Sequence, residues 1–130
     1  MKALIVFAHG SPVPEANQAV QTVAGEIRQR SDYDLVEAAF LDPAIPNLPE
    51  SVRKLAGAGV TRIVIVPYFL TPGLHLTQDL PRIVGDLRRI YEGVRIEVTE
   101  SLDGHPALIG AILDRARAVD GGSGPEGKAH

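Results

Sequence analysis

The stretch that decides the fold of this chain reads Val66-Pro67-Tyr68-Phe69-Leu70-Thr71-Pro72-Gly73-Leu74-His75-Leu76-Thr77-Gln78-Asp79-Leu80-Pro81. It begins as the end of an apolar strand and finishes as the start of an amphipathic helix, so it joins the two halves of a βα unit. The loop between them holds His75, one of only four histidines in the chain. An apolar loop with a single imidazole suits the wall of a ligand cavity better than a solvent-facing connection.

Outward from this stretch, four segments have the character of β-strands. Residues 3–8 are apolar throughout and residues 62–67 are apolar after Arg62, which is typical of central parallel strands covered on both faces. Residues 35–41 form a further predicted strand. Residues 94–99 alternate strictly between apolar and polar side chains, which places them towards a sheet edge.

Each predicted strand is followed by apolar residues at helical spacing. The four stripes are Ala16, Ala19, Val20, Val23, Ala24 and Ile27; Leu48, Val52, Leu55 and Ala56; Leu80, Ile83, Val84, Leu87 and Tyr91; and Leu108, Ile109, Ile112, Leu113, Ala116 and Val119. We expect the third helix to begin with Asp79 as its N-cap and Pro81 in its first turn. The fourth helix is entered through Gly104-His105-Pro106.

Four βα units in succession predict a single-domain α/β fold with a mainly parallel four-stranded sheet and helices on both faces. The commonest small arrangement has strand order 2-1-3-4, in which the chain reverses direction between strands 1 and 3. Ligands of such sheets bind at that reversal, outside the carboxyl ends of the strands. We assign this domain to residues 1–120 and predict a disordered tail for residues 121–130.

Composition narrows the possible functions. The 130 residues allow one domain, and 13 Lys and Arg against 16 Asp and Glu give a net charge of −3 with no basic stripe, which argues against a nucleic-acid partner. No apolar run approaches a membrane span, so we expect no membrane partner and a soluble, cytoplasmic protein. The absence of cysteine excludes disulfides, thiolate nucleophiles, Fe–S clusters and Cys-based zinc sites. A metal ion would have to be held by imidazole, carboxylate or water.

In the predicted topology, unusual residues meet at the reversal point. His9 ends the first strand, Asp42 ends the second, and His75 lies in the loop after the third. Each also has a purely structural interpretation. His9 and His75 could be histidines with local hydrogen bonds, Asp42 a turn residue before Pro43, and Ser11 a turn or helix-capping serine. We interpret His105 as the entry to a helix.

Three kinds of chemistry are compatible with a crevice at this position. A phosphate cradle is weakly supported, because Gly10-Ser11 is not a glycine-rich loop. A Ser-His hydrolase is also weakly supported, because no nucleophile elbow is present. Two imidazoles and one carboxylate form a sound metal site for Co, Fe, Ni or Zn and leave coordination positions open for exchange. Without thiolates such a site favours delivery of the metal over its storage.

The three loop motifs resemble those of the CbiX-type sirohydrochlorin chelatases, and they read His9-Gly10-Ser11, Phe40-Leu41-Asp42 and Pro67-Tyr68-Phe69-Leu70…Gly73-Leu74-His75…Asp79-Leu80-Pro81. The resemblance implies ATP-independent insertion of Co²⁺, Fe²⁺ or Ni²⁺ into sirohydrochlorin, in cobalamin or siroheme biosynthesis. The divalent metal is then a substrate, and no nucleotide or organic cofactor is expected. The family's metal-handling histidines map to His9 and His75, which are the predicted catalytic residues. Many bacterial relatives carry Glu where this chain has Asp42, the third predicted metal ligand.

The macrocycle needs an apolar wall and cations for its carboxylates. Arg82 and the backbone N–H groups at the start of the helix after His75 are the candidates for carboxylate recognition. The full set of predicted substrate-binding residues is Ser11, Tyr68, Phe69, Leu70, Gly73, Leu74 and Arg82.

One small domain cannot enclose such a macrocycle, and longer relatives look like two fused copies of this unit. We therefore expect a homodimer. The alternative is a non-catalytic metal- or tetrapyrrole-binding carrier on the same scaffold, which the shorter carboxylate of Asp42 keeps open. An unrelated flavodoxin-like binding module is less favoured, because its phosphate-binding turn is missing.

Overall fold

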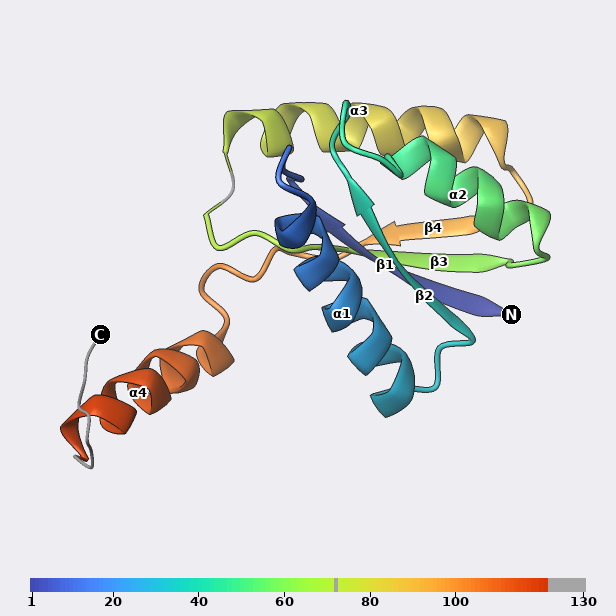
Figure 1. Ribbon diagram of the computed structural model, residues 1–130. Helices are drawn as coiled ribbons and strands as arrows, with labels where there is room; N and C mark the ends of the chain where they lie inside the picture. Colours follow the sequence, from blue (N-terminus) through green and yellow to red (C-terminus); the bar gives the residue numbers. More distant parts are fainter. Residues whose placement is uncertain (72, 122–130) are drawn as a thin grey trace.

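The computed structural model describes residues 1–71 and 73–121, and its centre is a four-stranded parallel sheet of order β2-β1-β3-β4 (Figure 1). The strand order predicted from the sequence is confirmed. The strands are β1 (Lys2–Ala8), β2 (Leu35–Phe40), β3 (Arg62–Pro67) and β4 (Arg95–Val98). Of the predicted tail, residues 122–130 lie outside the described residues.

Three helices cover the two faces of the sheet. Helix α1 (Pro14–Arg30) lies on one face, while α2 (Leu48–Gly57) and α3 (Leu74–Ile90) lie on the other (Figure 1). Pro14 starts α1 without loss of a helical hydrogen bond, because the first N–H groups of a helix have no partner within it. No described helix has both the length and the apolar character needed to cross a bilayer.

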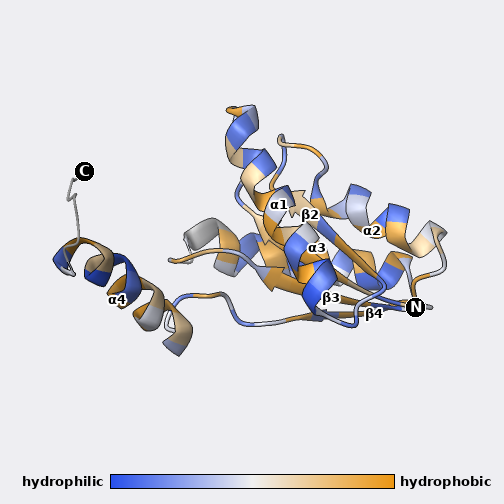
Figure 2. Cartoon of the chain, turned by 60° about the horizontal axis from the view of Figure 1, so that its bottom comes forward, coloured by the Kyte–Doolittle hydropathy of each residue, from blue (hydrophilic) through white to orange (hydrophobic). Residues whose placement is uncertain are grey.

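The alternation of side chains along β1 divides the core in two. Ala3, Ile5 and Phe7 point towards α2 and α3, and they share a cluster with buried residues of both helices. Leu4, Val6 and Ala8 point towards α1 and pack with its buried Ala24. The strands therefore run through the apolar centre of the domain in Figure 2, as expected for a sheet covered on both faces.

Helix α3 begins earlier than the sequence analysis predicted. Its N-cap is Gly73, and its first residue is Leu74. Leu76 is buried in the same cluster as Leu80, so the apolar stripe extends one turn towards the N-terminus and burial favours a longer helix. Pro81 lies inside the helix, not in its first turn, and the predicted Asp79 cap was wrong. The backbone of His75 is therefore helical.

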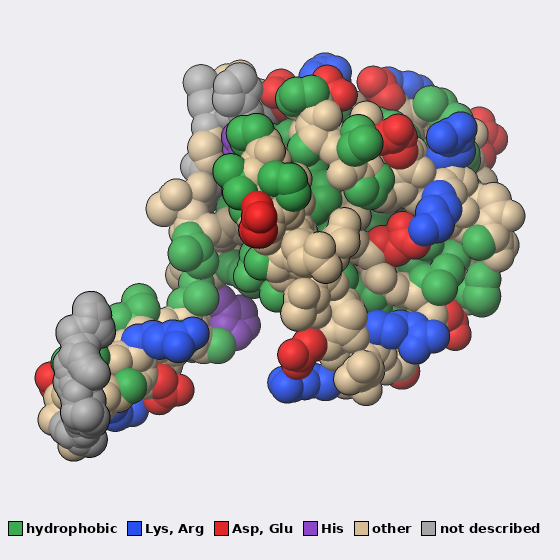
Figure 3. All heavy atoms as spheres, in the orientation of Figure 1, with side chains coloured by type: hydrophobic (Ala, Val, Ile, Leu, Met, Phe, Trp, Pro, Cys, Tyr) green, Lys and Arg blue, Asp and Glu red, His purple; other side chains and the backbone are tan. Residues whose placement is uncertain are grey.

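Helix α4 (Pro106–Asp120) begins where the sequence predicted, but it does not cover the sheet. His105 is its N-cap and accepts a hydrogen bond at Nδ1 from the Ala107 N–H, at 3.0 Å. No residue of this helix is buried, and it stands clear of the sheet and the other helices (Figures 1 and 3). Its apolar stripe is solvent-exposed, with Ile109 at 61% and Ile112 at 65%. An apolar stripe on a helix indicates that another surface covers it, but the sequence does not identify that surface.

Helix α2 is fixed at its start by a capping box. Asn47 Oδ1 accepts a hydrogen bond from the Glu50 N–H at 2.9 Å, and the Asn47 N–H donates to Glu50 Oε1 at 2.8 Å. Replacing Asn47 with Ala is expected to lower the free energy of unfolding by about 1 kcal/mol. Asn47→Asp keeps an acceptor at this position and should retain most of the stability. Urea denaturation of the three proteins tests this, and an Asn47→Ala midpoint equal to wild type would contradict it.

Candidate functional site

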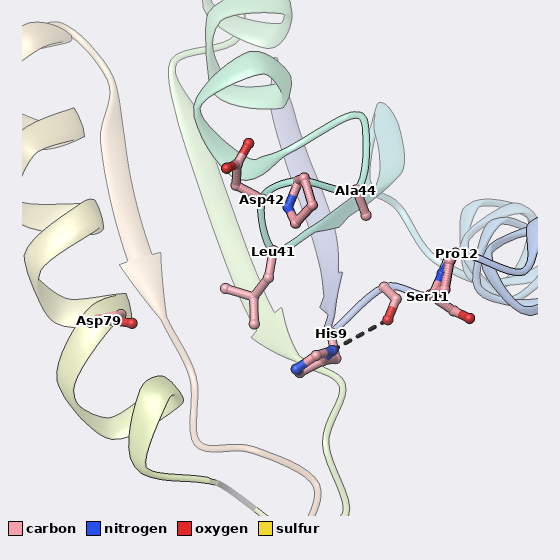
Figure 4. Close-up of a pocket in the computed structure, with 9 residues that line it drawn as sticks. His9, Ser11, Pro12, Leu41, Asp42, Ala44 and Asp79 are labelled. Carbon is pink, nitrogen blue, oxygen red and sulfur yellow. Dashed lines mark hydrogen bonds between the residues drawn. The ribbon is translucent and has the colours of Figure 1, made fainter.

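A cavity of about 520 Å³ opens at the carboxyl ends of β1 and β2, at the edge of the sheet where the sequence predicted the ligand site. The loops after β1 and β2 form most of it, and α3 contributes one residue from the facing side (Figure 4). Its lining residues are His9, Gly10, Ser11, Pro12, Leu41, Asp42, Pro43, Ala44 and Asp79. Three predicted site residues, His9, Ser11 and Asp42, therefore meet in one cavity.

His9 follows β1 directly and has an exposed ring. Its Nδ1 lies 3.3 Å from the Gly10 carbonyl oxygen, the hydrogen bond drawn in Figure 4. A carbonyl oxygen can only accept, so this contact assigns the proton to Nδ1 and leaves the lone pair on Nε2. A neutral imidazole with one free lone pair can hold a metal ion or accept a proton.

Close packing holds the loop of His9 against the loop of Asp42, although the two side chains point in different directions (Figure 4). Gly10 has φ +86°, and a Cβ at this position would lie 2.7 Å from the Cβ of Ala44 and 3.1 Å from that of Phe40. Only glycine fits both the backbone conformation and the space. The Leu41 N–H also donates to the Ala8 carbonyl at 3.2 Å, which extends the pairing of the two strands into the loops.

Ser11 stabilises the turn that leads into α1. Its Oγ accepts a hydrogen bond from the Val13 N–H at 3.0 Å, one of the structural roles considered for it from the sequence. The hydroxyl hydrogen can still donate to a ligand. The backbone of Ser11 is held by Asn17 in the first turns of α1, a residue that the sequence analysis did not identify.

Asp79 is a second carboxylate of the cavity that the sequence analysis assigned to a different role. It projects from α3 towards the loops after β1 and β2 (Figure 4). Arg82 Nη2 lies 3.7 Å from Asp79 Oδ1. The sequence signal was available, because Asp79 follows His75 by four residues and positions i and i+4 share one face of a helix. The spacing applies because α3 begins at Leu74, so that positions 75 and 79 both lie within the helix.

The backbone of Leu74 and His75 lies in the first turn of α3, but their side chains are outside the described part of the structure. Among the side chains that are described, no three His, Asp or Glu residues gather closely enough to hold a metal ion. This observation does not test the predicted set of His9, His75 and Asp42, because the side chain of His75 is outside the described part of the structure.

Of the residues predicted to form an apolar wall, some lie in the core and others lie on the surface. Phe69 turns inward and packs on Phe7, with ring centroids 6.1 Å apart, so it supports the loop after β3. Tyr68 and Leu70 are 39% and 64% exposed, and neither lines the cavity. Gly73 caps α3.

Arg82 was expected at the start of the helix after His75, and this placement was wrong. Because α3 begins at Leu74, Arg82 lies in its third turn, where the side chain is 65% exposed and outside the cavity lining. It cannot act together with the backbone N–H groups at the start of α3.

The fold and the site define a small doubly wound α/β domain whose ligand cavity at the strand reversal combines an imidazole with carboxylates. The family profile described as CbiX matches residues 3–119. The chain belongs to the CbiX family.

Individual relatives agree with this assignment. The chain is 38% identical over 93 residues to a sirohydrochlorin cobaltochelatase of Methanococcus maripaludis, an alignment that covers 72% of this chain and 62% of the relative. It is 28% identical to the chloroplastic sirohydrochlorin ferrochelatase of Arabidopsis thaliana, covering 86% of this chain and 50% of the relative. The crystal structure of a CbiX protein from Marinobacter aquaeolei VT8 superposes with a TM-score of 0.79 at 28% identity, covering 91% of this chain and 96% of the other.

Proposed function

We propose that this chain is an ATP-independent chelatase that inserts Co²⁺, Fe²⁺ or Ni²⁺ into sirohydrochlorin, with residues 1–120 as its chelatase-like domain. One observation carries the proposal. In a chain of the CbiX family, His9 and Asp42 line one cavity at the strand reversal. The cobaltochelatase and ferrochelatase names of its relatives support the same reaction and leave the metal open.

The reaction makes two demands that these residues can meet. The metal must exchange water for protein ligands that release it again, and imidazole and carboxylate groups suit Co, Fe and Ni in this role. Two pyrrole N–H protons must also leave the macrocycle, and the neutral ring of His9 or a nearby carboxylate can accept them. We assign metal handling to His9, His75 and Asp42, and we add Asp79 as a further proton acceptor.

The negative charges of the cavity constrain the orientation of the macrocycle. Its peripheral carboxylates would be repelled by Asp42 and Asp79, so these residues must face the metal and the pyrrole nitrogens at its centre. Tyr68 and Leu70 are exposed on the loop after β3 and offer apolar contacts to one face of the ring. The second face needs a wall that the cavity of a single chain does not provide.

We propose that a second copy of the chain completes the enclosure. The exposed stripe of α4, which includes Ile109 and Ile112, is an apolar surface of the kind that a second copy would cover. On the α1 side of the sheet, α1 packs mainly on β1 and β2, and Val66 of β3 there is only half-buried. Full burial of each large aliphatic side chain would contribute about 1.5–3 kcal/mol to association.

Charge placed on α4 should therefore dissociate the homodimer. The variant Ile109→Glu/Ile112→Glu is expected to be monomeric in analytical ultracentrifugation at a concentration where the wild type is dimeric. Ile90→Glu is the matched control, because Ile90 is 67% exposed at the end of α3 and its replacement should leave the dimer intact. A monomeric wild type, or a dimeric double variant, would contradict this proposal.

Activity is tested by mixing the purified protein with sirohydrochlorin and one metal at a time, with Fe²⁺ kept anoxic, and following the absorption of the macrocycle. We expect insertion of at least one metal well above the rate without protein. Equal rates with and without protein for all three metals would refute the chelatase. The cytoplasmic location stays a prediction, and cell fractionation would test it.

A further inference from the structure

The side-chain amide of Asn17 makes two hydrogen bonds to one backbone residue of the His9 loop. Asn17 Oδ1 accepts from the Ser11 N–H at 2.9 Å, and Asn17 Nδ2 donates to the Ser11 carbonyl at 2.8 Å. Both distances lie in the range of well-formed hydrogen bonds, and Asn17 is half-buried on α1. A carboxamide that pairs with both polar groups of one peptide residue restrains its position and its orientation.

This restraint acts on the residues that carry the imidazole. His9 and Gly10 connect the last residue of β1 to Ser11, so both ends of this short segment are held, one by the sheet and one by Asn17. The Gly10 carbonyl, which accepts the His9 Nδ1 hydrogen bond, belongs to the peptide bond with Ser11. Its direction therefore depends on how Ser11 is held.

We propose that Asn17 is a positioning residue of the site. By holding Ser11, it aims the Gly10 carbonyl at Nδ1 of His9, keeps the proton on that nitrogen and leaves the Nε2 lone pair for the metal. A group that fixes the tautomer of a metal-binding histidine commonly changes metal affinity by about 10–100-fold when it is removed. The metal part of this inference rests on the proposed function, whereas the tautomer part does not.

The tautomer can be read directly by long-range ¹H–¹⁵N NMR of the imidazole rings. In the neutral ring of wild-type His9 we expect the proton on Nδ1. In Asn17→Ala we expect a mixture of both tautomers, because the carbonyl is no longer held in place. Gln18→Ala is the matched control, since it removes an exposed amide from the next position of α1 and should leave the His9 tautomer unchanged.

Two outcomes would overturn the inference. One is a wild-type His9 protonated at Nε2, and the other is an Asn17→Ala protein whose His9 keeps the wild-type tautomer. If Asn17→Ala does not fold, Asn17→Asp provides the same test, because it keeps the acceptor for the Ser11 N–H and loses the donor to its carbonyl. A merely structural role would lower the denaturation midpoint without moving the tautomer.

Calorimetric titration with Co²⁺ alone extends the test to the metal. Asn17→Ala should bind Co²⁺ about tenfold more weakly than wild type and Gln18→Ala. A wild type that binds Co²⁺ but inserts no metal would refute the chelatase and leave the role of Asn17 intact. Unchanged Co²⁺ affinity in Asn17→Ala would instead refute the metal part of the inference, whether or not insertion occurs.

Discussion

Replacing His9 with Ala is expected to reduce the rate of metal insertion into sirohydrochlorin by a factor of about 10²–10⁴, the usual contribution of a positioned acid–base group. His9 lines the cavity, and a proton on Nδ1, the tautomer that the contact with the Gly10 carbonyl favours, makes Nε2 the atom available to a metal ion or a pyrrole proton. Alanine removes that atom and leaves the backbone of the loop unchanged. The rate should fall for every metal that the wild type inserts. Initial rates from the absorption of the macrocycle measure the effect.

The control for His9→Ala is His105→Asn. It also removes an imidazole, but asparagine is a good N-cap and should preserve the start of α4, where His105 caps the helix. This control should keep wild-type activity. His75→Ala should behave like His9→Ala, because the family resemblance gives both histidines the same role. Full activity in both His9→Ala and His75→Ala would refute the site assignment even if the protein is a chelatase.

Replacing Gly10 with Ala is expected to damage both stability and activity. The left-handed backbone costs a non-glycine residue roughly 1–2 kcal/mol. The new Cβ would also overlap the Cβ of Ala44 at 2.7 Å, so the loops after β1 and β2 must move apart. Because His9 and Asp42 lie on these two loops, their separation should change and insertion should slow. Urea denaturation and initial rates report the two effects.

A second substitution separates the backbone strain at Gly10 from the overlap with Ala44. In Gly10→Ala/Ala44→Gly the overlap with Ala44 is removed while the backbone strain remains, so this protein should recover part of the lost activity and less of the stability. Gly25→Ala is the matched control, because Gly25 lies within α1 with open space around its Cβ position, and alanine favours a helix. If Gly10→Ala were as stable and active as Gly25→Ala, the packing of the two loops would not be what positions His9.

The parts of the fold that could be predicted are those that depend on local patterns. The strand of residues 62–67 has the predicted bounds, because a short apolar run rich in β-branched residues is typical of a central strand. The strand order is the commonest one for four successive βα units, and the units alone do not determine it. The cavity then followed from the topology, since parallel strands place His9 and Asp42 at the same edge of the sheet.

What could not be predicted depends on contacts between distant residues. The start of α3 at Leu74 reflects the burial of Leu76 in the core, which local propensity does not report. The outward course of α4 was missed because an apolar stripe does not identify its partner. Asn17 was missed because its hydrogen bonds reach back from α1 to Ser11 in the loop before the helix, and no periodicity marks such a contact.

The central claim is that this chain catalyses metal insertion and does not merely carry the metal or the macrocycle. The most direct measurement uses sirohydrochlorin and Co²⁺ in large excess over the protein and counts the metallated macrocycle formed per protein chain, after subtraction of the protein-free reaction. The proposed chelatase predicts many turnovers, with product accumulating far beyond the amount of protein. Product that stops at one equivalent per chain would contradict the account and identify a carrier.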